Sequence, residues 1–130
     1  MPIEYVRKTA DKLNELDDML ISKLCKCSLE FYKDMVESYP DIVEDISVDE
    51  DKILAPTDIM KYIEFGTLVV NLPEDLSDVG INLEGGCDWD EDGIQWIVKD
   101  NDILYVGPWC FQNMWRADYD DGWNFAGVQN

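Results

Sequence analysis

Apolar residues in the first third of the chain recur at the spacing of one helical face. Successive members lie three or four positions apart, and polar residues fill the opposite side: Leu13, Leu16, Leu20, Leu24, Cys27, Phe31 and Met35. This period predicts a long amphipathic helix over residues 9–38. We expect the helix to end before Tyr39-Pro40, because a proline keeps the preceding residue out of the α region.

The next two segments predict an acidic connector and a short helix. Residues 39–56 hold many carboxylates around a few aliphatic side chains, and both a connector and one short helical turn fit this pattern. We favour the connector. Pro56-Thr57-Asp58 then indicates a helix start with Thr57 as the N-cap, and this helix is expected to reach about Tyr62.

Beyond Tyr62 the pattern becomes that of strands. Short β-branched or aromatic runs occupy residues 64–72, 79–87, 94–99 and 103–107, with turn-forming residues between them. Connections this short allow hairpins and leave no room for crossover helices. We therefore predict an α+β fold, in which the long N-terminal amphipathic helix packs on an antiparallel four-stranded β-meander. Residues 1–130 are expected to form a single domain, with the short helix and the meander in residues 57–107.

Residues 108–130 form an aromatic C-terminal extension whose structure the pattern leaves open. Phe111 and Trp115 have the i,i+4 spacing of a helix, whereas Trp123, Phe125 and Val128 alternate loosely as in a strand. Apolar residues continue almost to the last position, so no second domain is expected.

The charge of the chain narrows the class of partner. Asp and Glu number 29, Lys and Arg number 10, and the formal net charge is −19. A hydrophobic content of 46% is too high for a disordered acidic tail, so these charges are expected to surround a folded core. Such a surface repels nucleic acid and anionic membranes, and it attracts basic protein surfaces. The first residues lack the apolar run of a signal peptide, and no stretch approaches the ~20 apolar residues of a membrane span. We therefore predict a cytoplasmic protein that binds neither nucleic acid nor membrane.

The cysteines predict neither a metal site nor a disulfide. Cys25 and Cys27 fall in the expected helix, where side chains two positions apart point in nearly opposite directions. The chain contains no His, so mixed zinc ligand sets and Ser-His or Cys-His catalysis are excluded. We expect Cys25, Cys27, Cys87 and Cys110 to be reduced and mostly buried, and we expect no cofactor.

Residues 88–93, Asp-Trp-Asp-Glu-Asp-Gly, match the start of a calcium-binding loop. The twelfth position, where a bidentate Glu is required, is Lys99, and the flanking segments are predicted strands. Asp92-Gly93 instead fits a tight hairpin turn. We interpret this string, and the weaker one at residues 118–122, as turns that bind no specific metal.

The tryptophans suggest where a partner binds. Most of the five are expected in the core, but some next to carboxylates would form an aromatic and acidic surface suited to Arg and Lys side chains. The predicted partner-binding residues are Trp89, Asp90, Glu91 and Asp92. An alternative gives Glu91 or Asp92 a role in a glycosidase-type acid and base pair near Trp89 and Trp96.

Several short sequences in the middle of the chain resemble a family of small uncharacterised bacterial domains. They are Tyr39-Pro40, Gly80-Ile81-Asn82-Leu83, Cys87-Asp88-Trp89-Asp90 and Leu104-Tyr105-Val106-Gly107, and the likeness spans about residues 25–108. Members of this family typically carry a C-x-W-D-x-E-H-G signature. Cys87, Trp89, Asp90 and Gly93 match it, but this chain is one residue shorter between Trp89 and Gly93 and has no His.

The resemblance implies a small α+β domain of bacterial origin and carries no established activity. Members look like the acidic single-domain proteins found among toxin-immunity partners. Together with the charge, this favours a non-enzymatic protein-binding module that engages a basic protein partner, and an immunity or antitoxin-like protein is one form of such a module. The alternative is a small carboxylate-dependent hydrolase acting on a neutral or cationic substrate.

Overall fold

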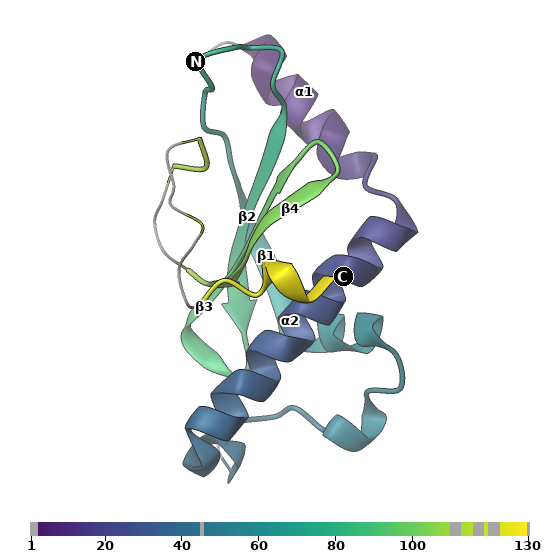
Figure 1. Ribbon diagram of the computed structural model, residues 1–130, viewed down its shortest axis with the longest axis vertical. Helices are drawn as coiled ribbons and strands as arrows, with labels where there is room; N and C mark the ends of the chain where they lie inside the picture. Colours follow the sequence, from purple (N-terminus) through teal and green to yellow (C-terminus); the bar gives the residue numbers. More distant parts are fainter. Residues whose placement is uncertain (1–2, 45, 110–112, 116–118, 120–122, 130) are drawn as a thin grey trace.

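The computed structural model describes residues 3–44, 46–109, 113–115, 119 and 123–129. Two α-helices, α1 (Ile3–Asn14) and α2 (Asp18–Ser38), precede a sheet of β1 (Ile63–Val69), β2 (Gly80–Cys87), β3 (Asp90–Lys99) and β4 (Asp102–Pro108). Each strand pairs antiparallel with the next, in the order β1-β2-β3-β4 (Figure 1). The predicted α+β class and four-stranded meander are confirmed.

The prediction of one helix over residues 9–38 is wrong, because the chain forms two helices there. α1 begins at Ile3 and α2 begins after Asp17, whose extended backbone and side chain make it an N-cap: its Oδ1 accepts a hydrogen bond of 2.7 Å from the backbone N–H of Leu20. The apolar period runs on across this break because Leu13 and Leu16 pack against the same core as Leu20. The end of the helix at Ser38, before Tyr39-Pro40, is confirmed.

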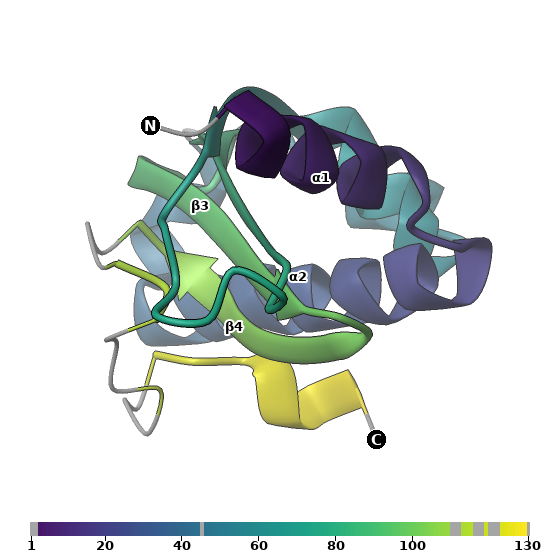
Figure 2. The ribbon, with the colours of Figure 1, turned by 90° about the horizontal axis from the view of Figure 1, so that it is seen from above.

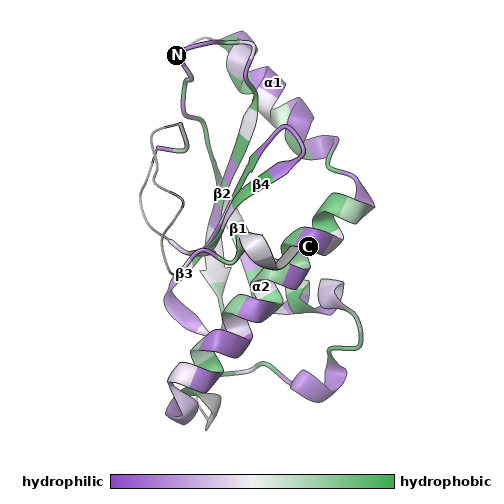
Figure 3. Ribbon diagram, in the orientation of Figure 1, coloured by the Kyte–Doolittle hydropathy of each residue, from purple (hydrophilic) through white to green (hydrophobic). Residues whose placement is uncertain are grey.

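α2 lies across one face of the sheet and supplies one wall of the main core (Figures 1 and 2). Hydrophobic and hydrophilic positions alternate along this helix (Figure 3), as its amphipathic sequence requires. Leu24, Cys27 and Phe31 are fully buried against strand residues that include Ile81 and Trp96. This packing fixes the position of α2 on the sheet.

The acidic segment at residues 39–56 contains two short 3₁₀ helices, η1 (Pro40–Glu44) and η2 (Glu50–Lys52). Short helical turns thus occur within a segment that we predicted as a plain connector. A third 3₁₀ helix, η3 (Pro56–Tyr62), leads directly into β1. Its N-cap is Ala55 and not Thr57 as predicted.

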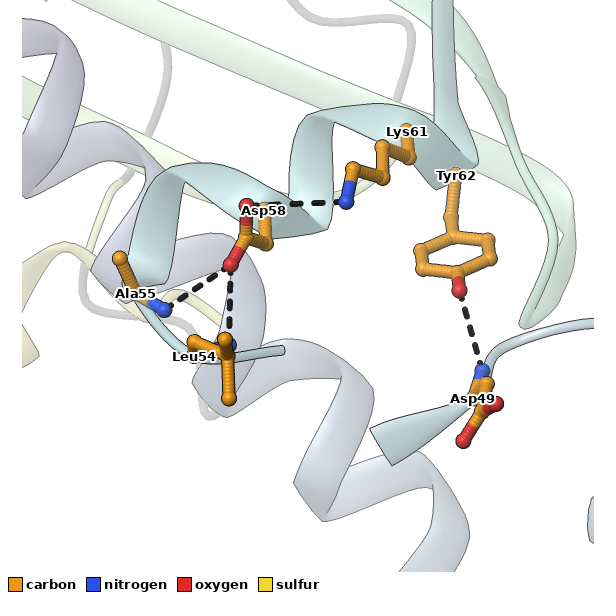
Figure 4. Close-up of polar contacts among 6 residues, drawn as sticks. All are labelled: Asp49, Leu54, Ala55, Asp58, Lys61 and Tyr62. Carbon is orange, nitrogen blue, oxygen red and sulfur yellow. Dashed lines mark hydrogen bonds and ion pairs between the residues drawn. The ribbon is translucent and has the colours of Figure 1, made fainter. Parts of the chain in front are cut away.

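Asp58 holds the start of η3 in place (Figure 4). Its Oδ2 accepts backbone hydrogen bonds from Leu54 at 2.9 Å and Ala55 at 3.0 Å, and Oδ1 lies 3.8 Å from Nζ of Lys61. The bonds from Ala55 and Leu54 lower the pKa of Asp58, with a further contribution from Lys61. This carboxylate therefore stabilises the fold in its charged form.

The hairpin between β2 and β3 differs from the prediction. The turn is Asp88-Trp89, since Cys87 pairs with Asp90, and β3 begins at Asp90 rather than Ile94. Asp92-Gly93 lies inside β3, in a bulge where residues 91–93 face a single position of β2. Gly93 has φ +89°, and a Cβ there would lie 2.4 Å from the carbonyl oxygen of Gly85. The glycine is therefore required by the bulge and not by the turn.

The C-terminal segment returns to the sheet beside β4 and α2 (Figure 2). The backbone N–H of Phe125 donates to the carbonyl of Val106 at 2.8 Å, and the ring of Phe125 stacks on Phe31 with centroids 5.4 Å apart. A short 3₁₀ helix, η4 (Ala126–Gln129), follows, so the strand alternative for Trp123 to Val128 is wrong. The alternative helix through Phe111 lies outside the described residues.

Candidate functional site

A groove of about 540 Å³ lies where α2 ends and β3 begins. We call it the acidic groove, and its lining residues are Met35, Tyr39, Ile42, Trp89, Asp90, Glu91, Asp92, Pro108, Trp109 and Trp123. They come from the last turn of α2, η1, the β2–β3 hairpin, the end of β4 and the C-terminal segment. All four predicted partner-binding residues line this one concave surface.

The bulge in β3 determines how the carboxylates are presented. Glu91 and Asp92 are exposed, whereas Asp90 is half-buried and its Oδ1 accepts a 2.9 Å hydrogen bond from the backbone N–H of Asp92. Burial raises the pKa of Asp90, the backbone bond opposes this rise, and the charges of Asp92 and Glu91 add to it. Keeping Asp90 ionised therefore costs free energy in the folded protein.

Within the described part of the chain, no residue that lines the acidic groove is Lys or Arg. The ion pairs between described residues all lie elsewhere: Lys33–Glu30, Lys52–Asp49, Lys61–Asp58 and Lys99–Asp78. A second, smaller hollow of about 380 Å³ shares Asp92 and Trp109 with the groove and adds Glu64 and Glu84. The groove thus lies in a continuous region of negative charge that no ion pair between described residues offsets.

Trp89, one of the predicted partner-binding residues, is buried. Only 2% of this residue is exposed, and its ring packs edge-on against Phe31 and Tyr32 at centroid distances of 5.7 Å and 5.8 Å. The turn folds the side chain back onto α2, where it forms both core and groove wall. Its Nε1 is shielded from solvent and has no hydrogen-bond partner among the described residues. The partner-binding role of Trp89 stays a prediction.

Several groove residues were not predicted. Tyr39 is 52% exposed and Trp123 is 39% exposed, and with Trp109 they make the groove aromatic on more than one side. They lie far from residues 89–92 in the chain, and no spacing in the sequence links them. Trp96, by contrast, is in the core as expected for most tryptophans, and its Nε1 donates to Oγ of Ser28 at 2.8 Å.

The calcium-like string does not converge on one point. Asp88 accepts a hydrogen bond from the hydroxyl of Ser47, whereas Asp90 accepts from the backbone of Asp92. Within the part of the chain that the structure describes, no group of three or more Cys, Asp or Glu residues has a geometry that could hold a metal ion. The absence of a specific metal site stays a prediction. The string at residues 118–122 lies almost wholly outside the described residues.

Two of the described cysteines, Cys25 and Cys87, have thiols with little nucleophilic character. Cys25 and Cys27 are buried in α2, and Cys87 is half-buried at the end of β2. Burial raises the pKa of Cys25 to about 11 and that of Cys87 to about 12. Both thiols are therefore protonated near neutral pH and are poor nucleophiles. Cys110 lies outside the described residues.

Comparison with protein families places the chain in one of them. A family described as a domain of unknown function (DUF6985) matches residues 1–111, so the chain belongs to this family. This confirms an uncharacterised domain family, while the signature motif and the bacterial origin stay predictions. No curated protein and no solved structure matches the chain. Among the described helices, none is both long and apolar enough to span a membrane.

Proposed function

We propose that this DUF6985 domain is a protein-binding module whose acidic groove binds Arg or Lys side chains of a basic partner. One observation carries the proposal. Three consecutive carboxylates, Asp90, Glu91 and Asp92, share a concave surface with aromatic residues, and none of the described residues that line it is basic. Carboxylates favour a cation at this position, and the aromatic side chains offer stacking and cation–π contacts to it.

The electrostatics of the groove favour a positively charged ligand. The surroundings of Asp90 raise its pKa, so its ionised form costs free energy in the free protein. A cation bound beside Asp90 would offset that cost. The net charge of −19 also speeds the encounter with a basic surface at low salt. A basic toxin is one partner of this chemistry, and this chain would then act as its immunity protein. The net charge and the groove fit a basic toxin and other basic proteins equally well.

Calorimetric titration with a capped peptide of alternating Gly and Arg tests the proposal on the full chain. The double variant Glu91→Gln with Asp92→Asn removes two groove charges, and Asp11→Asn with Glu15→Gln removes two exposed charges at the α1 end of the molecule (Figure 1). We expect the groove variant to weaken binding about tenfold, equivalent to about 1.4 kcal/mol, and the control to weaken it much less. Equal losses in both variants would mean that the peptide senses only net charge, and the groove would then not be the site.

A hydrolase remains the second candidate because of Asp90. Its raised pKa, next to Glu91 and Asp92 in the same groove, is the arrangement expected of a general acid beside an ionised carboxylate. Mass spectrometry of the peptide after prolonged incubation separates the two functions. Cleavage that disappears in Asp90→Asn would establish the enzyme, whereas an unchanged peptide mass with retained binding is the result that we expect.

A further inference from the structure

We infer that the ligand of the acidic groove presents a hydrogen-bond acceptor together with its cation, so that it is a basic residue within a peptide and not a bare organic cation. This inference rests on the proposed function and narrows the chemical class of the ligand. It is carried by Trp89, which lines the groove and whose buried indole N–H has no partner among the described residues.

An indole N–H is only a donor, so an acceptor alone can satisfy it. Most buried polar groups in proteins are paired, and Trp96 on the same sheet follows that rule by donating to Ser28. Trp89 is as buried as Trp96, at 2% and 3% exposure, and yet its N–H has no such partner among the described residues. A buried donor left in this state in a groove wall indicates that the bound state supplies the acceptor.

The neighbours of Trp89 explain why the acceptor and the cation belong to one ligand residue. Trp89 directly precedes Asp90, Glu91 and Asp92 in the chain, and all four residues line the groove. A Lys or Arg residue in a peptide carries both a backbone carbonyl and a side-chain cation. An alkylguanidinium or a polyamine offers only the cation.

The shielding of the indole nitrogen adds a structural requirement. The nitrogen is buried, so a ligand reaches it only if side chains around the ring shift. Tyr39 and Trp123 are the exposed aromatic residues of the groove, and we expect them to move when the ligand enters.

Indole N–H resonances in ¹H–¹⁵N spectra of the full chain test the inference with two matched ligands. Acetyl-arginine methylamide has a guanidinium and two carbonyls, whereas propylguanidinium has the same head group and none. Loss of one indole signal in Trp89→Phe assigns the resonance of Trp89. We expect acetyl-arginine methylamide to move that resonance downfield and to bind about fivefold more tightly than propylguanidinium, and we expect the preference to disappear in Trp89→Phe.

The outcomes separate this inference from the proposed function. If neither ligand binds, the proposed function fails and the inference falls with it. If both bind equally and the Trp89 resonance stays in place, the groove binds cations but the inference is overturned. An upfield Trp89 proton in the free protein that no ligand moves would also overturn it, because the N–H would then be donated to the face of a neighbouring ring.

Discussion

Trp96 and Trp89 are both buried against α2, but only the indole N–H of Trp96 has a hydrogen-bond acceptor among the described residues. The N–H of Trp96 donates to Ser28, whose hydroxyl in turn donates to the carbonyl of Leu24. The N–H of Trp89 faces no acceptor among the described residues, although the ring contacts Phe31 and Tyr32. An unpaired buried donor costs about 1–3 kcal/mol of folding free energy. Trp89, at the hairpin end of the sheet, carries this cost, whereas Trp96, in the middle of β3, does not.

The carboxylates repeat this difference. At η3, Asp58 accepts two backbone hydrogen bonds and pairs with Lys61, and its pKa is lowered. At the groove, Asp90 accepts one backbone bond, lies beside two further acids and has a raised pKa. At η3 the charge of the carboxylate is therefore balanced within the fold by hydrogen bonds and a cation. The groove combines an unpaired donor with uncompensated charge, which is typical of a surface adapted to a ligand.

We expect the substitution to Phe to reduce stability by different amounts at the two tryptophans. We expect Trp96→Phe to lower the free energy of unfolding by about 2 kcal/mol, because it removes apolar area and a made hydrogen bond. Trp89→Phe should lower it by only about 1 kcal/mol. The N–H group that this substitution removes makes no hydrogen bond to a described residue in the free protein, so only apolar contact is lost. Urea unfolding of both variants measures the difference. A larger loss for Trp89→Phe would show that its N–H is already satisfied.

The two acids predict opposite effects on stability at pH 7. Asp90→Asn keeps an oxygen for the backbone N–H of Asp92 and removes an unfavourable charge, so it should raise the free energy of unfolding, by less than about 1 kcal/mol because the group is partly exposed. Asp58→Asn should lower it, because the charged form is the one that the fold stabilises. Thermal unfolding of the two variants beside the natural chain measures both signs.

The pH dependence follows from the same directions. Asp90 has a raised pKa, so its contribution to stability is present below its ordinary pKa of 3.8 and is lost as pH rises through the raised value. Asp58 has a lowered pKa, so its contribution is present above 3.8 and is lost as pH falls through the lowered value. A destabilised Asp90→Asn at pH 7 would contradict this description of the groove.

Calcium should have the smallest effect. Asp88 and Asp90 accept hydrogen bonds from different parts of the chain, and Lys99 occupies the position of the closing acid. We expect no stoichiometric calcium binding by calorimetry at near-physiological salt, only a weak stabilisation that fades as salt is added. Micromolar binding that is lost in Asp90→Asn would show that the groove is a metal site.

The pattern of apolar residues was sufficient to predict the sheet, because β-branched and aromatic runs separated by short turns are a strong local signal. It missed the break at Asp17, since α1 and α2 present their apolar residues to one core and the period continues across the cap. It also placed the turn at Asp92-Gly93, because a glycine with positive φ in a bulge looks the same in sequence as one in a turn.

The candidate site was predictable only in its local part. Asp90, Glu91 and Asp92 stand out because they are consecutive acids beside an aromatic residue. Tyr39, Trp109 and Trp123 reach the groove through tertiary packing of α2, β4 and the C-terminal segment, which no local pattern encodes. The burial of Trp89 depends on Phe31 and Tyr32, more than fifty positions earlier in the chain.

The indole signals of all five tryptophans, followed while the Gly-Arg peptide is added, test most directly whether the acidic groove is the binding site. Trp89, Trp109 and Trp123 line the groove, whereas Trp96 is in the core and Trp115 donates its N–H to the carbonyl of Asn71. We predict that the three groove signals shift with one common dissociation constant while those of Trp96 and Trp115 stay in place. Shifts of Trp115 alone, or saturable binding that moves none of the three groove signals, would contradict the assignment of the site.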